Sequence, residues 1–273
     1  MRRFGGLAAW AFLLLFFVLP LVALLPEAFS DGGSAFGRVF GDALFLGAAR
    51  NTVLLGLVAG GVSALVGTAI AIELARQPAS RRQWMMTLLG LPLAFSGLVI
   101  AYGFILAFGR AGLVTQLLAM LGADPAYVGS WIYTVGGLGF AYAYYLIPRV
   151  ALSLYPVFAN FDERPLLAAR TLGASRLRAF WDTVVPEVAP SVVSSACLVA
   201  ALAMGTYGTA LALVGTQVNI LPLLLLAKVG DGGGDFPAAA AMSLVLLAIC
   251  VIVLGVGDVI TSRREQKSLE GGH

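Results

Sequence analysis

Long uninterrupted apolar stretches constrain this chain more than any other feature. A transmembrane helix needs about 20 consecutive, mostly apolar residues, and six stretches of the 273-residue chain satisfy this requirement. They are residues 7–29, 52–75, 84–108, 130–152, 191–214 and 238–260. Only 11% of the residues are charged, against about 25% in a typical soluble domain. We therefore expect an all-α membrane protein with six transmembrane helices in one domain, residues 1–265.

Basic residues are distributed unevenly between the two sides of this predicted topology. Thirteen lie on the side of the termini and four lie on the other side. The thirteen are Arg2, Arg3, Arg76, Arg81, Arg82, Arg149, Arg164, Arg170, Arg176, Arg178, Arg263, Arg264 and Lys267, and the four are Arg38, Arg50, Arg110 and Lys228. Cytoplasmic loops carry the excess of Lys and Arg, so we expect both termini in the cytoplasm. The net charge of +3 then reflects topology, and no nucleic-acid partner is expected.

The two ends of the chain and its Gly-rich connections contain no predicted functional residues. Arg2-Arg3 before an apolar run fits a secretory signal, but the run is too long and no cleavage site follows, so an uncleaved first helix is expected. Residues 266–273 form a tail whose Leu-Glu-Gly-Gly-His end resembles a cloning remnant. The Gly-rich connections 30–51, 109–129 and 215–237 are expected to be loops or short re-entrant turns.

A long polar interruption, Asp162–Pro190, separates the predicted fourth and fifth helices, and we call it the elbow. Gly173 is expected to end a first helix in the left-handed conformation, and Ser175 to cap a second. Apolar residues at helical spacing in the second helix predict a single stripe: Leu177, Phe180, Trp181, Val184 and Val185. Pro186 and Pro190 are expected to close the elbow. Such a segment suits docking to a soluble partner, and the alternative is an amphipathic helix that lies on lipid.

The elbow resembles the cytoplasmic loop of permease subunits in type I binding-protein-dependent ABC importers. That loop has the pattern Glu-Ala-Ala, three residues, Gly, nine residues, Ile-x-Leu-Pro, and here Leu167 and Thr183 replace its Glu and Ile. The resemblance implies that the elbow seats in a groove of an ATPase. The contact residues that it implies are Ala168, Ala169, Gly173, Leu177, Phe180, Trp181, Val185 and Pro186.

The same resemblance implies a complex in the bacterial inner membrane. Its members are two permease subunits, two ATP-binding subunits that hold ATP and Mg, and an extracytoplasmic solute-binding protein, all assembled on the lipid bilayer. Residues 204–237 look most like permeases of the polyamine, phosphonate and ferric-iron group. This sub-group favours a paralogue over an identical copy as the second permease. It implies a small polar or charged solute such as a polyamine, a phosphonate or an iron complex.

Polar residues inside the predicted helices indicate a translocation pathway. The fifth helix contains Gly205, Thr206, Tyr207, Gly208 and Thr209 in succession. Glycines loosen the helix there, and hydroxyls can replace water around a polar solute. Tyr102 on the third helix is the expected facing residue. For the two tyrosines, a packing role is an equally open alternative.

Residues needed for several other functions are missing from the sequence. The only histidine is His273, and neither of the two lysines follows a glycine, so no Ser-His hydrolase, histidine metal site or P-loop is expected. We expect a non-catalytic chain without a cofactor of its own. The alternative is an ATP-independent secondary transporter or channel, whose inverted repeats or midplane ionisable residues are not evident. Gly56, Gly60 and Gly61 predict a small-residue packing face.

Overall fold

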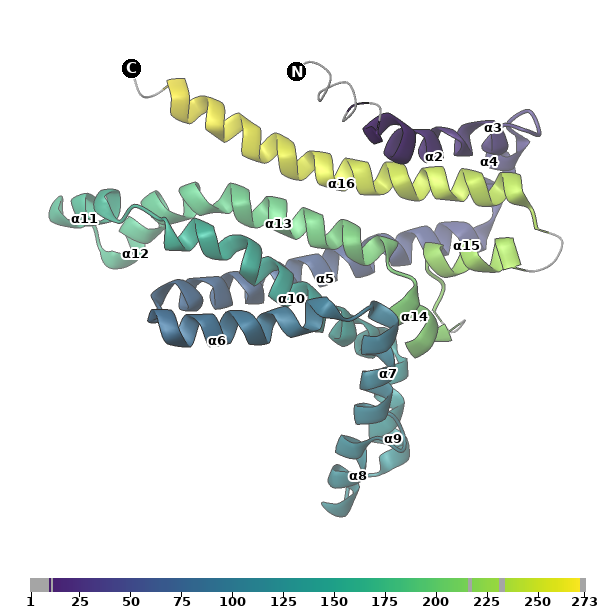
Figure 1. Ribbon diagram of the computed structural model, residues 1–273, viewed down its shortest axis with the longest axis horizontal. Helices are drawn as coiled ribbons and strands as arrows, with labels where there is room; N and C mark the ends of the chain where they lie inside the picture. The colour runs from purple at the N-terminus through teal and green to yellow at the C-terminus, as the bar shows by residue number, and fades with distance from the viewer. Residues whose placement is uncertain (1–9, 11, 216–217, 231–233, 271–273) are drawn as a thin grey trace. The chain divides into compact units, whose positions relative to one another are not determined.

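The chain is helical in the part that the structure, a computed structural model, describes (Figure 1). The described residues are 10, 12–215, 218–230 and 234–270, with side chains through Ser262. The chain divides into two compact units, one from the start of the chain to Thr52 with Asn219–Ile249, the other Val53–Val218 with the residues from Cys250 onward. The predicted all-α class is confirmed for these residues.

The first unit joins the beginning of the chain to a segment near its end. Its elements are η1 (Leu14–Val18), α2 (Leu19–Val22), α3 (Leu24–Ala28), α4 (Ser34–Gly41), the start of α5 (Ala43–Arg76), α15 (Leu221–Gly230) and the start of α16 (Phe236–Glu270). Val39, Phe45 and Met242 belong to its buried apolar cluster. The Thr52 hydroxyl ties α5 to α15, because it donates to the Ala48 carbonyl at 2.8 Å and accepts from the Leu221 N–H at 2.8 Å.

Arg38 on α4 connects two acidic residues of this unit. Its guanidinium lies 2.8 Å from the Asp31 carboxylate and 3.1 Å from that of Asp235. A hydrogen bond from the Ser34 hydroxyl and the neighbouring Arg38 lower the pKa of Asp31 to about 2. These side chains are partly exposed, so water screens the ion pairs, and they fix local geometry more than they add stability.

The second unit contains the remaining elements. They are the rest of α5, α6 (Ala79–Gly90), η2 (Leu91–Ala94), α7 (Gly97–Phe108), α8 (Leu113–Met120), α9 (Pro125–Ser130), η3 (Trp131–Tyr133), α10 (Val135–Ala159), α11 (Arg164–Thr171), α12 (Arg176–Ala179), η4 (Phe180–Val184), α13 (Val185–Gly205), α14 (Gly208–Leu213) and the last part of α16. α10 packs along α13, and α7 packs against α14 (Figure 1). The buried face of α10 repeats every four residues: Leu138, Tyr142, Leu146, Val150 and Leu154.

Glycines allow α5 to approach other helices of the second unit closely. A Cβ at Gly60 would lie 2.7 Å from the Ala200 Cβ on α13, and one at Gly56 would lie 2.4 Å from the Met204 Cγ. Gly61 was predicted on the same face, but a Cβ there would have no heavy atom within 4 Å. The small-residue face is therefore correct for Gly56 and Gly60 and wrong for Gly61. Close backbone approach is how membrane helices gain dispersion contacts.

Four helices in the described part of the chain are long and apolar enough to cross a membrane. They are Ala43–Arg76, Gly97–Met120, Arg176–Gly205 and Phe236–Ser262, and they overlap the predicted second, third, fifth and sixth spans. In the predicted first span the apolar helix Leu14–Ala28 is shorter, and residues 7–9 and 11 lie outside the described residues, as do Arg2, Arg3 and residues 271–273. The predicted fourth span corresponds to α10, which contains Arg149 and several tyrosines. The count of six spans stays a prediction.

The predicted third span, residues 84–108, is two helices instead of one. α6 ends at Gly90, η2 follows, and Phe95 and Ser96 are extended. Pro92 has no N–H with which to continue an α-helix. The Ser96 hydroxyl then accepts from the Val99 N–H at 3.4 Å and starts α7. Apolar composition does not reveal such a break, because the residues next to it are apolar on both sides.

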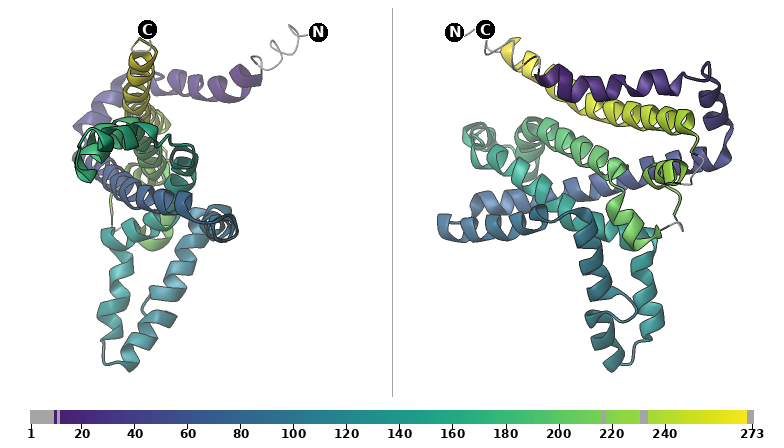
Figure 2. Two further views of the ribbon diagram at one scale, coloured as in Figure 1. Left: turned by 90° about the vertical axis from the view of Figure 1, so that its left-hand side faces the viewer. Right: turned by 45° about the vertical axis from the view of Figure 1, so that its right-hand side comes forward.

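Helices also occupy the connections that were predicted to be loops or short re-entrant turns. Residues 109–129 contain α8 and α9, which contact each other, and residues 215–237 contain α15. Figures 1 and 2 show α7, α8 and α9 in one helical arm of the second unit. The Asp124 carboxylate accepts from the Ala126 N–H at 2.8 Å and caps α9 ahead of Pro125. Gly-rich composition therefore marked the turns between these helices and not the whole connections.

Candidate functional site

The elbow carries two short helices separated by a glycine turn, beside the ends of α10 and α13 (Figure 1). Gly173 has a φ of 90°, in the left-handed region. Its N–H donates to the Arg170 carbonyl at 3.1 Å, and the Ala174 N–H donates to the Ala169 carbonyl at 3.1 Å. These two bonds form a Schellman cap on α11. The Ser175 hydroxyl accepts from the Arg178 N–H at 3.3 Å and caps α12, so both predicted caps are present.

A π-helical turn divides the predicted apolar stripe of the elbow. The Val185 N–H donates to the Phe180 carbonyl, five residues earlier, and Phe180–Val184 follow this wider spacing. As a result Val184 is buried, whereas Leu177 and Trp181 are 69% and 59% exposed. The prediction of one continuous stripe is wrong, because it assumed α-helical spacing throughout.

The two prolines do not close the elbow as predicted. α13 runs from Val185 to Gly205 and contains Pro186 near its start and Pro190 in its interior. Pro186 lies where five-residue spacing returns to four-residue spacing, a place that tolerates a residue without an N–H. The second half of the elbow is therefore continuous with α13, within the candidate membrane-spanning stretch Arg176–Gly205.

Exposed apolar side chains gather at the tip of the elbow. Leu172, beside the glycine turn, is 88% exposed. Among the other predicted contact residues, Ala168 and Phe180 are exposed, whereas Ala169, Val185 and Pro186 are partly buried. Leu172 was missed because it lies outside the predicted stripe, although a leucine directly before a capping glycine was a usable signal. Exposed apolar groups at a polar loop mark an interaction surface.

Two ion pairs lie within the elbow. The Asp162 carboxylate accepts from the Arg164 N–H at 3.0 Å and from its Nε at 3.0 Å, which lowers the pKa of Asp162 below its usual range. Arg178 and Asp182 lie 3.4 Å apart on the second helix. These pairs are exposed and contribute little stability. They leave the apolar tip as the distinctive feature of the elbow.

The Gly205–Thr209 run, which was predicted to loosen the fifth helix, divides it into two helices. α13 ends at Gly205, Thr206 is extended, and α14 begins at Gly208. The Tyr142 hydroxyl donates to the Thr206 carbonyl at 3.0 Å, and the Thr206 hydroxyl donates to the Leu202 carbonyl at 2.7 Å. Side chains thus satisfy carbonyls that a continuous helix would have paired.

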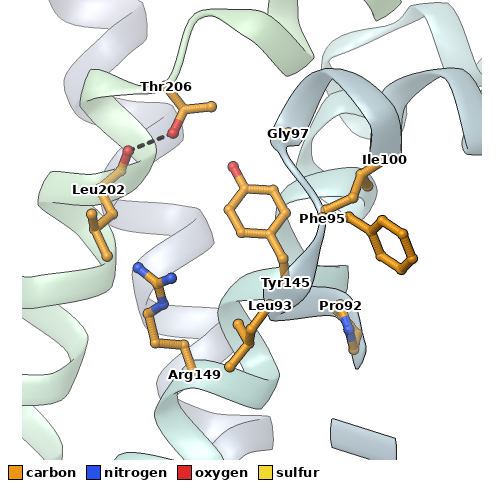
Figure 3. A pocket seen from close by; sticks show the side chains of 9 residues that line it. All are labelled: Pro92, Leu93, Phe95, Gly97, Ile100, Tyr145, Arg149, Leu202 and Thr206. Carbon is orange, nitrogen blue, oxygen red and sulfur yellow. Dashed lines mark hydrogen bonds between the residues drawn. The ribbon is translucent and has the colours of Figure 1, made fainter. Parts of the chain in front are cut away.

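A cavity of about 200 Å³ lies beside this break (Figure 3). It is lined by Pro92, Leu93, Phe95, Gly97, Ile100, Tyr145, Arg149, Leu202 and Thr206. Thr206 is the one predicted pathway residue in its wall. Thr209 is fully buried, and a Cβ at Gly97 would lie 2.4 Å from its hydroxyl oxygen, so the starts of α7 and α14 are in close contact.

The remaining predicted pathway residues do not line this cavity. Tyr102 and Tyr207 are exposed, Gly205 is exposed at the end of α13, and a Cβ at Gly208 would be 3.7 Å from Leu98. Their pathway role stays a prediction. Tyr145 and Arg149 were missed because Arg149 was assigned to a cytoplasmic flank. Their spacing of four residues inside an otherwise apolar helix was the signal that could have revealed them.

Residues 63–266 match the family described as the binding-protein-dependent transport system inner membrane component. The chain belongs to this family. The matched residues include both the elbow and the cavity. The chain is therefore a transmembrane permease subunit of an ABC importer. Subunits of this family are generally non-catalytic, and the ATPase is a separate chain.

Several named relatives extend over most of the chain. A sulfate transport system permease protein CysW of Synechocystis is 28% identical over 254 residues, covering 89% of this chain and 87% of the relative. The CysT protein of Salmonella typhimurium is 26% identical over 255 residues, covering 92% and 89%. The molybdenum permease ModB of Mycobacterium bovis is 28% identical over 194 residues, covering 71% of each chain.

A solved structure shows the same fold. It is a bacterial alginate ABC transporter in complex with an alginate-bound periplasmic protein, with a TM-score of 0.74, 15% identity, and coverage of 96% of this chain and 94% of the other. The predicted importer family is thus confirmed. The finer resemblance to polyamine, phosphonate and ferric-iron permeases is not supported, because the relatives are named for sulfate and molybdenum. That resemblance rested on Gly- and Pro-containing turns, which do not identify a solute.

Proposed function

We propose that this chain forms half of the translocation pathway of an importer for a small inorganic oxyanion of the sulfate class. The observation that carries the proposal is the similarity to a sulfate permease over 254 residues, which cover 89% of the chain. A molybdenum permease among the relatives fits the same solute class, because molybdate is also a tetrahedral divalent oxyanion.

The proposed complex contains a second permease, two ATP-binding subunits and a solute-binding protein. Two differently named sulfate permeases of Synechocystis, CysW and CysT, both resemble this chain. This pair supports a paralogue, and not an identical copy, as the second permease. ATP and Mg belong to the ATP-binding subunits in this proposal. Both termini and the elbow are placed in the cytoplasm, on the evidence of the basic residues.

The elbow is proposed as the contact with the ATPase. Its exposed tip, Leu172, Leu177 and Trp181, offers an apolar anchor for a groove. Movement of the ATP-binding subunits would displace the tip, and the continuous helical residues Arg176–Gly205 would carry that displacement to the break at Thr206. ATP binding and pathway opening are then linked by a coupling free energy between distant sites.

Trp181→Ala tests this contact. We expect association with the ATPase to weaken roughly tenfold or more, because an aromatic anchor at an interface contributes about 2 kcal/mol. The membrane helices should be unaffected, since Trp181 is exposed and its one ring contact in the described structure is with Phe180. Co-purification of the ATPase and uptake give the measurement. Trp84→Ala, an exposed tryptophan on α6, is the control. Unchanged assembly and uptake in Trp181→Ala would favour an elbow that lies on lipid.

Solute competition tests the proposed substrate class. Cells or vesicles with the complete transporter are expected to accumulate labelled sulfate. Excess unlabelled molybdate, which shares its charge and shape, should reduce that uptake, whereas spermidine should not. Uptake of spermidine, a phosphonate or ferric iron in place of either oxyanion would contradict the proposal.

A further inference from the structure

Arg149 lies within α10 and lines the cavity beside the helix break (Figure 3). The guanidinium carries a positive charge at any pH that a cell experiences. None of the ion pairs or hydrogen bonds in the described part of the chain involves its side chain. A cation that faces a cavity in a membrane protein, without a carboxylate partner, marks a pathway for a charged solute.

The cavity wall also offers a hydroxyl donor. The Tyr145 hydroxyl is buried and makes no well-formed hydrogen bond among the described residues, and the hydroxyls of Thr206 and Thr209 lie near it. Tyr145 precedes Arg149 by one helical turn, so both side chains extend from the same face of α10. The Thr206 hydroxyl, across the cavity, already donates to the Leu202 carbonyl at 2.7 Å. The wall therefore has unused donors on Arg149 and Tyr145, and it lacks a carboxylate.

Unused donors around a fixed positive charge select a ligand by its chemistry. The ligand must supply several acceptor oxygens and negative charge, as an inorganic oxyanion does. A polyamine or a metal cation would meet repulsion from Arg149 and no acceptor carboxylate. The other wall residues, including Pro92, Leu93 and Ile100, are apolar. An apolar surround strengthens the attraction between the guanidinium and an anion.

We propose that Arg149 and Tyr145 form a station that holds a divalent tetrahedral oxyanion during its passage through this cavity. The assignment rests on the proposed oxyanion import and adds the residues that select the charge of the solute. One guanidinium and one hydroxyl attract an anion without enclosing it. A site in a transport pathway must bind its solute strongly enough for the solute to enter and weakly enough for the solute to leave.

Thiol modification tests the station without relying on transport. Leu93→Cys places a thiol in the cavity wall of the assembled transporter, in a background with Cys197→Ser and Cys250→Ser. An anionic methanethiosulfonate is expected to react about tenfold faster than a cationic one, because Arg149 attracts it. Sulfate should slow the anionic reagent. In Arg149→Gln the preference and the protection should both disappear, and in Arg149→Lys the preference should persist. If the preference for the anionic reagent and the protection by sulfate are the same with Arg149 and with Arg149→Gln, the proposed station is overturned.

Measurements of sulfate uptake distinguish an error in the proposed station from an error in the proposed function. With normal complex yield, Arg149→Gln is expected to lower sulfate uptake about tenfold or more, the loss typical of a charged hydrogen-bonding group. Tyr145→Phe should cause a smaller loss, and Tyr144→Phe, which removes a hydroxyl outside this cavity, should cause none. Normal uptake in Arg149→Gln would reject the station alone. A wild-type complex that imports neither sulfate nor molybdate would reject the proposed function, and the station with it.

Discussion

Replacing Gly173 with valine is expected to lower transport by at least about tenfold while the membrane helices stay folded. Gly173 has a φ of 90°, and a Cβ there would meet no heavy atom within 4 Å, so the effect comes from the backbone alone. A left-handed residue with a Cβ costs about 1–2 kcal/mol, and a β-branched residue is still less tolerated. Relief of that strain would undo the cap on α11 and displace the tip of the elbow from its proposed contact with the ATPase.

Two variants serve as controls for this prediction. Gly173→Asn should retain more transport than Gly173→Val, because asparagine accepts the left-handed conformation better. Gly255→Val adds the same side chain to α16 at a helical glycine whose Cβ would meet open space, and it should behave as wild type. Uptake and ATPase co-purification measure the effect. If Gly173→Val equals Gly173→Asn in both assays, the glycine turn is not needed for coupling.

Replacing Gly60 with leucine is expected to prevent assembly of the permease. A Cβ at this position would lie 2.7 Å from the Ala200 Cβ and 2.9 Å from the Ala196 carbonyl oxygen. Both obstacles belong to the body of α13 and not to the end of a flexible side chain, so α5 and α13 must separate. Overpacking of a well-packed core typically costs about 1–3 kcal/mol, and a whole leucine is an extreme case. The yield of intact complex should therefore fall by about tenfold.

Gly61→Leu is the matched control for Gly60→Leu. It changes the next residue of the same helix in the same way, but a Cβ at Gly61 would have no heavy atom within 4 Å. We expect normal complex yield, measured by size-exclusion chromatography after detergent extraction. Equal losses in both variants would show that the effect arises from helix insertion and not from contact with α13.

Local sequence signals predicted the elbow well and its continuation poorly. Gly173 and Ser175 act through bonds to neighbours within a few residues, and both caps form as their residue types indicate. The π turn at Phe180–Val184 depends on how the elbow joins α13, and no periodicity rule detects it. The prediction that Pro186 and Pro190 close the elbow also failed, because α13 contains both prolines and Pro186 lies where the hydrogen-bond spacing changes.

Apolar composition located membrane helices but not the breaks within them. Pro92 and Ser96 divide a stretch that is apolar throughout, and the break places residues around Gly97 in the cavity wall. Arg149 illustrates the opposite error. Counting it among flanking charges helped to assign topology, but its own position within α10 assigns it to the cavity. Which side chains of α10 line the cavity depends on how α10 packs against helices that are distant in sequence. A single sequence does not show that packing.

ATP dependence of oxyanion uptake is the most direct test of the central claim. Proteoliposomes would contain this chain, its partner permease and the ATP-binding subunits, with the solute-binding protein on the outer side and nucleotide inside. We expect labelled sulfate to accumulate with ATP, and not to accumulate with a non-hydrolysable ATP analogue or without the binding protein. Equal accumulation under all three conditions would contradict this expectation and would favour an ATP-independent transporter or channel.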